Sequence, residues 1–281
     1  MRILVFGSSG ILGTSLLKTG GVSHEIDAPS SVDVDCRDFP SVEERISDFK
    51  PQVVVNACAI KLPPSTISTM LDGTEYVINV KFPEWLASLS STYEFHLVHA
   101  SSDSVFGESQ LGPFDSKSEP LPSTVYGKMK REAEERILSS ASSYSILRFG
   151  PLFGLSISKR NTIRRLFESI LNGKEVSPDS SNYVSFTDAL TLSERVLEFI
   201  VYRPPGIFHF SARSSYTWWH VANEFAWLIG QELLIPDHPS TPKNDRRLVP
   251  GSAAQCDLGP LQESLERYVR AQLKEFEKSV Q

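Results

Sequence analysis

Met1-Arg-Ile-Leu-Val-Phe6 leads directly into Gly7-Ser-Ser-Gly10-Ile-Leu-Gly13, and a helix-forming run from Thr14 to Thr19 comes next. The first segment is compact, largely apolar and without alternation, which is typical of a parallel strand covered on both faces. Glycines between a strand and a helix let the backbone approach a phosphate group, which then lies at the helix N-terminus. The stretch therefore predicts an α/β fold, a Rossmann-type doubly wound parallel sheet.

The glycine spacing is Gly-x-x-Gly-x-x-Gly, which alone is a weak indication of a dinucleotide site, and its place after a buried strand strengthens it. A second predicted strand, His24–Ile26, is closed by Asp27, 20 positions after Gly7. A carboxylate there can accept hydrogen bonds from an adenosine ribose and repels a 2′-phosphate, which favours NADH. An ordinary turn explains Asp27 equally well, and Arg37 is near enough to receive a 2′-phosphate. NADH and NADPH therefore both stay open.

Two further strands are predicted in the first half of the chain, Pro51–Asn56 and Glu94–Ala100. The first ends in the small residues 57–59, which leave room for a ligand in the crevice at the carboxyl edge of a parallel sheet. The second delivers Ser102 to the same edge. A hydroxyl there can hydrogen-bond a substrate carbonyl and stabilise developing oxyanion charge, although a serine-rich loop is a common alternative.

Tyr126 and Lys130 are four residues apart, and the run of good helix formers from Lys128 to Leu138 predicts that this stretch is helical, so the two side chains share one helix face. An ammonium beside a phenol favours the phenolate, so this tyrosine should exchange a proton nearer neutral pH than its free pKa of about 10 allows. Taken by itself, the spacing is also explained by an exposed tyrosine and lysine on an amphipathic helix. The glycine turn and Ser102 favour the chemistry of carbonyl reduction.

Composition describes an ordinary globular protein: 281 residues, 40% hydrophobic and 22% charged. The net charge of −6 argues against nucleic acid or an anionic membrane as the main partner. Three cysteines, Cys36, Cys58 and Cys256, have neither disulfide-scaffold nor metal-site spacing, so buried or half-buried thiols and no metal are expected. The apolar start is too short for a signal peptide or membrane span, and a cytoplasmic location is predicted.

These motifs, in this order, resemble the extended branch of the short-chain dehydrogenase/reductase family, and within it the dTDP-4-dehydrorhamnose reductases and their sugar-nucleotide relatives. Ser101–Gly107 is similar to that group's Ser-Thr-Asp-Tyr-Val-Phe-Asp-Gly segment, and Val53–Ala57 to its strand ending in Val-Asn-Ala-Ala. Asn79 matches the family's helix, and Gly206–Ser211 matches its Gly-Ile-Tyr-His strand. The resemblance covers nearly the whole chain, most specifically residues 1–154.

The resemblance implies an NAD(P)-binding Rossmann domain at residues 1–154. It implies that residues 155–281 mainly form a small C-terminal α/β lobe that binds the substrate, with 203–215 returning to the main sheet. It implies an NAD(P)H-dependent oxidoreductase that reduces a 4-keto-6-deoxy nucleotide sugar, as in dTDP-rhamnose biosynthesis. In such an enzyme Tyr126 protonates the carbonyl oxygen, Ser102 holds that oxygen, and Lys130 lowers the Tyr126 pKa and binds the nicotinamide ribose. A homodimer is an open option.

The residues that the resemblance, together with the glycine turn and strand ends, assigns to ligands form two groups. The cofactor group is Gly7, Ser9, Gly10, Ile11, Leu12, Gly13, Asp27, Asp35, Ala57, Cys58, Ala59, Asn79, Tyr126, Lys130 and Gly150. The substrate group is Ser102, Asp103, Arg164 and Arg246, because arginine recognises a diphosphate through paired hydrogen bonds.

Departures from the family pattern keep alternatives open. Ser104 stands where dehydratases carry glutamate, which disfavours loss of water. A nucleotide-sugar epimerase with retained NAD uses the same Ser/Tyr/Lys set. The segment from Arg246 to Ala253 differs from the reductases' Arg-Arg-Pro stretch, which puts the usual substrate in doubt more than the chemistry. A non-catalytic NADP-binding regulatory subunit, similar to that of methionine adenosyltransferase, is a further alternative.

Overall fold

The computed structural model describes residues 1–21, 23–63, 66, 73–154, 161–214, 216–231 and 244–280. Its centre is a parallel sheet of six strands in the order β2-β1-β3-β4-β5-β9. The bounds of these strands are Arg2–Phe6 (β1), Glu25–Asp27 (β2), Val53–Asn56 (β3), His96–Ala100 (β4), Tyr144–Arg148 (β5) and Gly206–His209 (β9). The predicted doubly wound α/β fold is therefore confirmed.

The strand order reverses between β1 and β3, and such a switch point is where open parallel sheets bind ligands. In the β1–β3 pair, Phe6 lies beside Asn56, and Asn56 in turn lies beside His99 of β4. Because all the strands are parallel, the segments that follow β1, β3, β4 and β5 leave the sheet along one edge. Among the residues predicted to bind ligands, those of the glycine turn, residues 57–59, Ser102, Asp103 and Gly150 follow these strand ends.

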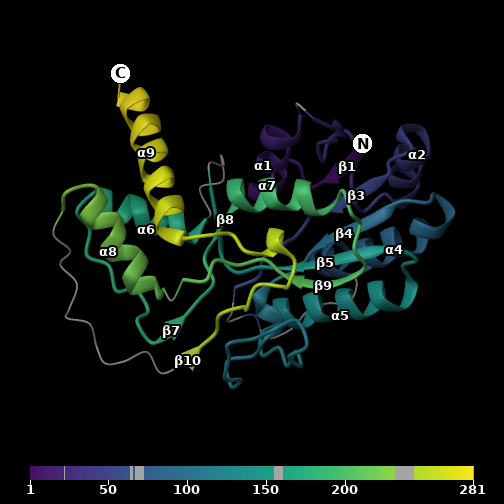
Figure 1. Ribbon diagram of the computed structural model, residues 1–281. Helices are drawn as coiled ribbons and strands as arrows, with labels where there is room; N and C mark the ends of the chain where they lie inside the picture. The colour runs from purple at the N-terminus through teal and green to yellow at the C-terminus, as the bar shows by residue number, and fades with distance from the viewer. Residues whose placement is uncertain are drawn as a thin grey trace.

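Helices cover both faces of the sheet (Figure 1). On one face lie α1 (Ile11–Gly20) and α7 (Ala189–Phe199), which share one hydrophobic core with β1 and β3. On the other lie α2 (Phe39–Phe49), α4 (Phe82–Thr92) and α5 (Val125–Ser140), with a second core. The division predicted at residue 154 did not anticipate α7, because this helix of the second half packs on the first-half sheet.

The second lobe packs α6 (Thr162–Leu171), α8 (Trp218–Leu228) and α9 (Leu261–Val280) around their own apolar core, at the far side of Figure 1 from α2. Aromatic rings form this core: the centroids of Phe167 and Phe225 are 5.3 Å apart. Short strand pairs complete the lobe and connect it to the sheet: β6 (Leu152–Phe153) with β8 (Thr187–Asp188), and β7 (Asn182–Tyr183) with β10 (Asn244–Asp245).

Four short helical segments link these elements: α3 (Thr74–Tyr76), the π-helical turn η1 (Val77–Lys81), and the 3₁₀ turns η2 (Asp103–Val105) and η3 (Ala254–Cys256). The sequence predicts one continuous helix from about 72 to 89. The structure instead interrupts it with η1, which rotates Asn79 into the interior, where the side chain is fully buried. A π-helical turn of this kind often marks a functional region.

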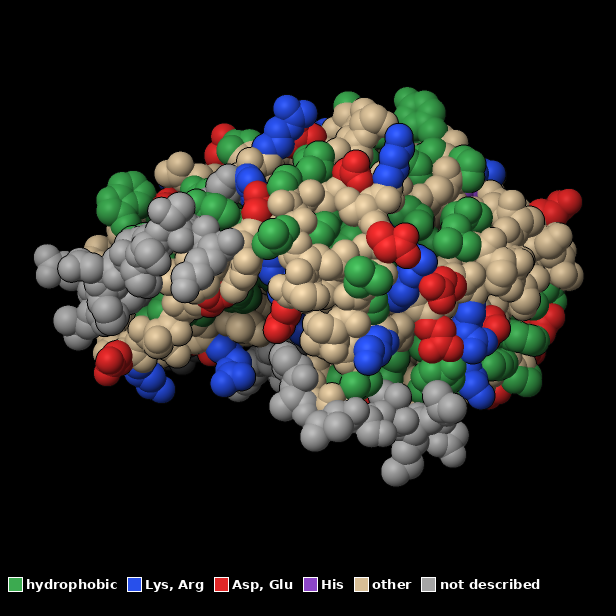
Figure 2. Space-filling model, turned by 90° about the horizontal axis from the view of Figure 1, so that it is seen from below, with side chains coloured by type: hydrophobic (Ala, Val, Ile, Leu, Met, Phe, Trp, Pro, Cys, Tyr) green, Lys and Arg blue, Asp and Glu red, His purple; other side chains and the backbone are tan. Residues whose placement is uncertain are grey.

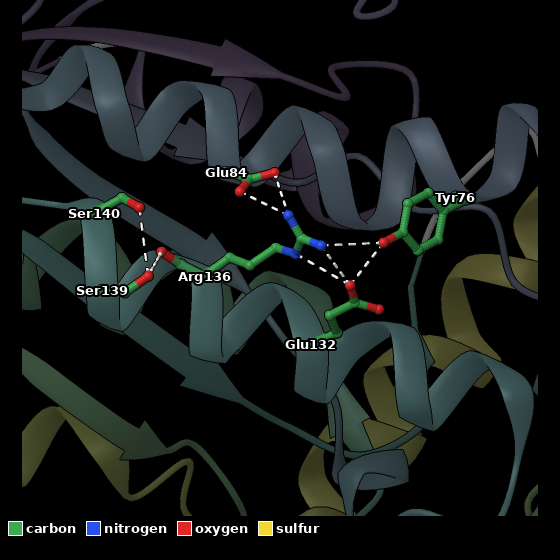
Figure 3. A network of polar contacts seen from close by, with 6 residues as sticks. All are labelled: Tyr76, Glu84, Glu132, Arg136, Ser139 and Ser140. Carbon is green, nitrogen blue, oxygen red and sulfur yellow. Dashed lines mark hydrogen bonds and ion pairs between the residues drawn. The ribbon is translucent and has the colours of Figure 1, made fainter. Parts of the chain in front are cut away.

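Outside the sheet, a polar network ties α5 to α3 and α4 (Figure 3). Arg136 donates to both carboxylate oxygens of Glu84 at 2.7 Å and to Glu132, which also accepts from the Tyr76 hydroxyl at 2.6 Å. Arg136 is half-buried, so solvent screening leaves such pairs worth little individually. On the face shown in Figure 2, acidic and basic side chains are interspersed, so neither sign dominates it.

In the part of the chain that the structure describes, no helix combines the length and apolar character that a membrane crossing requires.

Candidate active site

A cavity of about 470 Å³ lies at the carboxyl edge of the sheet, where segments of the second lobe meet it. Ser102, Asp103 and Tyr126 line it, and so does Arg246 from the distant C-terminal part of the chain. Arg164 does not line it, because this side chain lies on α6, where it pairs with Glu168 at 2.8 Å. The prediction of Arg164 as a substrate residue is therefore not supported, whereas Arg246 is in place.

Tyr126 reaches the cavity because it lies in the first turn of α5, which begins at Val125. Thr124 caps the helix by accepting a hydrogen bond from the Gly127 amide at 3.0 Å. At Gly127 a Cβ atom would lie 2.1 Å from the carbonyl oxygen of Ser104, so only glycine lets the first turn of α5 approach the serine segment this closely. The phenol and the serine hydroxyl are thereby brought to one cavity.

Ser102 lies at the start of η2, two residues after β4 ends. Its hydroxyl accepts a hydrogen bond from the Ser104 amide at 3.1 Å and lies 3.1 Å from both the Asp103 carboxylate and the Ser104 hydroxyl, to either of which it can donate. The hydroxyl can rotate between these partners and a ligand in the cavity. It is therefore able to donate to an incoming carbonyl oxygen.

Lys130 is fully buried and is not among the described residues that line the cavity; its ammonium donates to the Ala100 carbonyl at 2.8 Å, at the end of β4. Burial lowers the pKa of Lys130 to about 8, against the opposing influence of Cys58 and Glu134. Burial also raises the pKa of Tyr126, and the charge of Asp103 raises it further. This differs from the expected lowering by Lys130, because desolvation of the phenolate outweighs any attraction from that ammonium.

Asp103 shares the cavity with Arg246. Burial raises the pKa of Asp103, and the charge of Arg246 is the largest opposing influence. Arg246 is held by its own donation to the Phe106 carbonyl at 3.1 Å and by backbone pairing with Tyr183. A guanidinium fixed in this way can receive an anionic group of a ligand without losing much side-chain entropy.

The glycine turn after β1 has the geometry that a phosphate cradle needs. Gly7 has a φ of +86°, and a Cβ atom there would lie 2.6 Å from the Ala57 carbonyl carbon, so the turn tolerates no side chain. Gly10 precedes α1, whose N-terminus has no side-chain cap and no acidic residue in its first turn. The first amides of α1 are therefore free of capping side chains and can bind an anion, which fits the pyrophosphate of a dinucleotide.

Other predicted cofactor residues divide by environment. Ile11 and Gly150 line the cavity, and Ser9 and Ala59 are exposed at the same edge. Leu12, by contrast, is 5% exposed and packs in the hydrophobic core, so its side chain is structural.

Asn79 is also structural. Its amide donates to the Ile60 carbonyl at 2.9 Å and accepts from the Ile60 amide at 3.0 Å. It holds the segment after β3, and direct contact of this buried side chain with a cofactor is not supported.

Both carboxylates of the predicted cofactor group, Asp27 and Asp35, are already paired. Arg45 donates two hydrogen bonds of 2.6 Å to Asp27, and Arg37 donates to both oxygens of Asp35. Arg37 was the predicted receiver of a 2′-phosphate, yet the structure also places the guanidinium of Arg45 at the end of β2. Charge on Asp27 is thereby balanced, so this carboxylate is a weaker argument for NADH than its position suggested.

The profile of the RmlD substrate binding domain matches residues 1–251. The chain belongs to this family. The family's dTDP-4-dehydrorhamnose reductase from Aggregatibacter actinomycetemcomitans is 27% identical over 79% of this chain and 76% of its own length. Methionine adenosyltransferase 2 subunit beta from Danio rerio is 26% identical over 77% of this chain and 70% of its own length. The resemblance stated from the motifs is confirmed.

Solved structures agree on the fold. A dTDP-4-dehydrorhamnose reductase from Clostridium acetobutylicum superimposes with a TM-score of 0.84 at 23% identity, covering 97% of this chain and 100% of that one. Another, from Bacillus anthracis in complex with NADP, has a TM-score of 0.84 at 19% identity, covering 96% of this chain and 99% of that one.

Several residues that line the cavity were not predicted from the sequence: Lys61, Glu108, Asn161, Asp179, Asn182 and Trp218. Only the tryptophan carried a signal in the sequence, because Trp218-Trp219 stands in an aromatic-rich stretch shortly after Gly206–Ser211. The others come from loops without periodicity, where spacing gives no direction to a side chain. Their meeting depends on how the second lobe lies against the sheet.

A buried ion pair beneath the cavity was also missed. Glu134 and Arg148 are 0% and 1% exposed and bond through both carboxylate oxygens, at 2.8 and 2.6 Å. Ser101, next to the catalytic candidate Ser102, donates to the same carboxylate at 2.6 Å. Two signals could have revealed the pair: Glu134 follows Lys130 by four positions on one helix, and Arg148 is a charged residue in an otherwise buried strand.

Proposed function

We propose that the protein is an NAD(P)H-dependent reductase of a 4-keto-6-deoxy nucleotide sugar. The observation that carries the proposal is that Ser102 and Tyr126 line one cavity, with the Lys130 ammonium bonded to the Ala100 carbonyl at the end of β4 and the glycine turn at the same sheet edge. The related dTDP-4-dehydrorhamnose reductases support the reaction class. A nicotinamide dinucleotide, when bound, supplies the hydride.

Tyr126 acts as the proton donor. Because burial and Asp103 raise its pKa, the phenol keeps its proton at neutral pH and can pass it to a carbonyl oxygen in the cavity. Ser102 donates a hydrogen bond to the same oxygen and stabilises the negative charge that develops on it. Lys130, while protonated, stabilises the phenolate left behind, and its ammonium can hydrogen-bond a ribose.

Arg246 is the proposed anchor for the diphosphate of the substrate, because it is the predicted arginine that reaches the cavity. The nucleotide sugar is the proposed small-molecule partner of the protein. We also propose a cytoplasmic location, supported by three free cysteines. We also propose that the protein forms a homodimer.

The direct test is oxidation of NADH and NADPH, followed by absorbance, with a panel of 4-keto-6-deoxy nucleotide sugars and protein checked for retained cofactor. Consumption of either cofactor with one sugar supports the proposal and identifies the substrate. If cofactor binds but no sugar is reduced, the reductase proposal fails. Tightly retained NAD in that case would favour the epimerase.

A regulatory subunit is the second candidate, favoured by the relatives named methionine adenosyltransferase 2 subunit beta. In that function the protein binds NADPH without consuming it and alters the kinetics of a synthetase. The discriminating measurement mixes the protein with a methionine adenosyltransferase catalytic subunit and follows co-elution and synthetase rate. Co-elution together with silence in the reductase assay would favour this candidate.

A further inference from the structure

Two thiols far apart in the sequence meet at the edge of the nucleotide crevice. Cys36 lies in the segment between β2 and α2, and Cys58 lies two residues after β3. Their Sγ atoms are 3.5 Å apart, and both side chains are half-buried and free of disulfides. The third cysteine, Cys256, is fully buried elsewhere in the fold.

The surroundings of this pair are those of the proposed cofactor site. A Cβ atom at Gly7 would lie 2.7 Å from the Cys58 amide nitrogen, so the Cys58 backbone touches the glycine turn. The Cys58 amide donates to Asn56 at 3.1 Å, which fixes it at the strand end. On the other side, Cys36 follows Asp35 of the predicted cofactor group. The two thiols therefore join the two segments that border the crevice.

The contact also makes the thiols chemically unequal. The two thiols are within hydrogen-bond distance and either can donate; this contact lowers the pKa of Cys36 and raises that of Cys58. Since the thiolate is the nucleophile in thiol oxidation, Cys36 reacts first and Cys58 stands beside it to complete a disulfide.

We propose that Cys36 and Cys58 are an oxidation site at which a hydroperoxide forms an intramolecular disulfide, and that this disulfide weakens dinucleotide binding. The Cys36 thiolate attacks the distal peroxide oxygen, the O–O bond breaks, and the alcohol or water leaves with a proton, which yields a sulfenic acid. The Cys58 sulfur then attacks the Cys36 sulfur, the S–O bond breaks, and water leaves. Two thiols are oxidised and one hydroperoxide is reduced.

The effect on binding follows from the distance that must close. A disulfide holds its sulfurs about 2 Å apart, so the two segments or their rotamers must shift from the present 3.5 Å separation. The Cys58 segment is already packed against the glycine turn. Gly7 lies so close to Ala57 that a Cβ atom on it would clash with the Ala57 backbone. Displacement there changes the surface on which a pyrophosphate would lie. This second half of the proposal rests on the proposed cofactor site, whereas disulfide formation does not.

The test compares the full-length reduced protein with protein treated with hydrogen peroxide. Peptide mass spectrometry without reductant should find one cross-link, joining Cys36 to Cys58, and dithiothreitol should reverse it. The Kd for NADPH or NADH, whichever binds the reduced protein, should rise about tenfold or more on oxidation. In Cys36→Ser, peroxide should produce no cross-link and no change in Kd, whereas Cys256→Ala should behave like the parent protein.

Each failure has its own meaning. Absence of the cross-link in peroxide-treated parent protein, or sulfinic acid at Cys36 in its place, overturns the oxidation site. A cross-link without a change in Kd overturns the effect on binding. Reduced protein that binds neither dinucleotide overturns the proposed function, and with it the effect on binding, while the mass spectrum still decides the oxidation site independently.

Discussion

At the residue scale, burial dominates the electrostatics of the candidate site. The structure raises the pKa of Tyr126 and lowers that of Lys130 to about 8, so both groups favour their neutral forms relative to water. A phenol that stays protonated is suited to donate a proton in a reduction. The lysine is then the group whose charge changes near neutral pH.

Tyr126→Phe removes the proton donor while leaving the ring and the glycine turn in place. Turnover should fall on the order of a hundredfold or more, and the dinucleotide Kd should stay within about twofold of the parent value. Steady-state kinetics and a binding titration measure the two quantities. Unchanged turnover would remove Tyr126 from the mechanism.

The pH dependence should report Lys130. Its pKa is lowered to about 8, so the ammonium is present below that pH and is lost as pH rises through it. Because Tyr126 titrates above its ordinary value, it stays protonated across this range. We expect kcat/KM to be level below about pH 8 and to fall above it.

Lys130→Arg supplies the control for that profile. Arginine remains protonated at every pH used, so the residual activity of this variant should lack the descent above about pH 8. A parent profile that stays level to about pH 10 would contradict the assignment.

Cofactor preference should depend on Arg45. It neutralises Asp27 through two hydrogen bonds of 2.6 Å, and its loss exposes a carboxylate that repels a 2′-phosphate. Arg45→Ala should therefore weaken NADPH relative to NADH by about tenfold, measured as the ratio of Kd values. Arg37→Ala is the matched comparison, since Asp35 holds that guanidinium. A larger shift in Arg37→Ala would assign the 2′-phosphate to Arg37 instead.

At the element scale, the site depends on how closely the first turn of α5 approaches the segment after β4. Gly127 permits that approach, because a Cβ atom there would lie 2.1 Å from the Ser104 carbonyl oxygen. The sequence places Tyr126 and Lys130 on one face of the helix, but this glycine sets the distance of that face from Ser102.

Gly127→Ala should push α5 away from the serine segment. We expect kcat/KM to fall on the order of a hundredfold, since a displacement of about 1 Å is enough to have that effect. Gly173→Ala is the control: Gly173 has a φ of +65° and no atom of the described residues within 4 Å of its Cβ position, so the change should cost about 1 kcal/mol of stability without changing kcat. Thermal unfolding and kinetics of both variants measure the contrast, and equal activities would refute it.

At the scale of the whole molecule, one buried network joins four segments. Glu134 of α5 bonds Arg148 of β5 and Ser101 after β4, and Arg148 lies 3.4 Å from the Nε2 atom of His209 on β9. Burial and Arg148 lower the pKa of His209 to about 4, so that ring is neutral and its Nδ1 can donate to the Phe114 carbonyl. The network connects α5, which carries Tyr126 and Lys130, to the strand that returns from the second half of the chain.

Glu134→Gln should destabilise the protein by on the order of 3 kcal/mol, because it leaves the buried charge of Arg148 without its counter-ion. Urea unfolding followed by fluorescence gives the value. Arg136→Gln is the exposed control, since the Arg136 pairs of Figure 3 are half-exposed, and it should cost no more than about 1 kcal/mol. Similar costs for the two variants would contradict the weight given to burial.

Much of the fold was readable from the sequence because its signals are local. The strand, glycine turn and helix at the N-terminus are contiguous, and β1 and α1 form where the pattern indicates. The site was predicted in part: Ser102, Tyr126 and Arg246 reach one cavity. Asn79 and Arg164 do not line this cavity, since a π-helical turn rotates the first inward and the second pairs with Glu168 on α6.

By itself the sequence determined what depends on neighbours in the chain: the α/β order, the cradle of glycines and the shared face of Tyr126 and Lys130. A helix repeats every 3.6 residues whatever surrounds it, so that spacing survives folding. The tertiary structure alone decided the contact of Cys36 with Cys58, the pairing of Glu134 with Arg148 and the direction of the Tyr126 pKa shift. Each of these depends on desolvation or on distances between segments remote in the sequence, which exist only once the elements have packed.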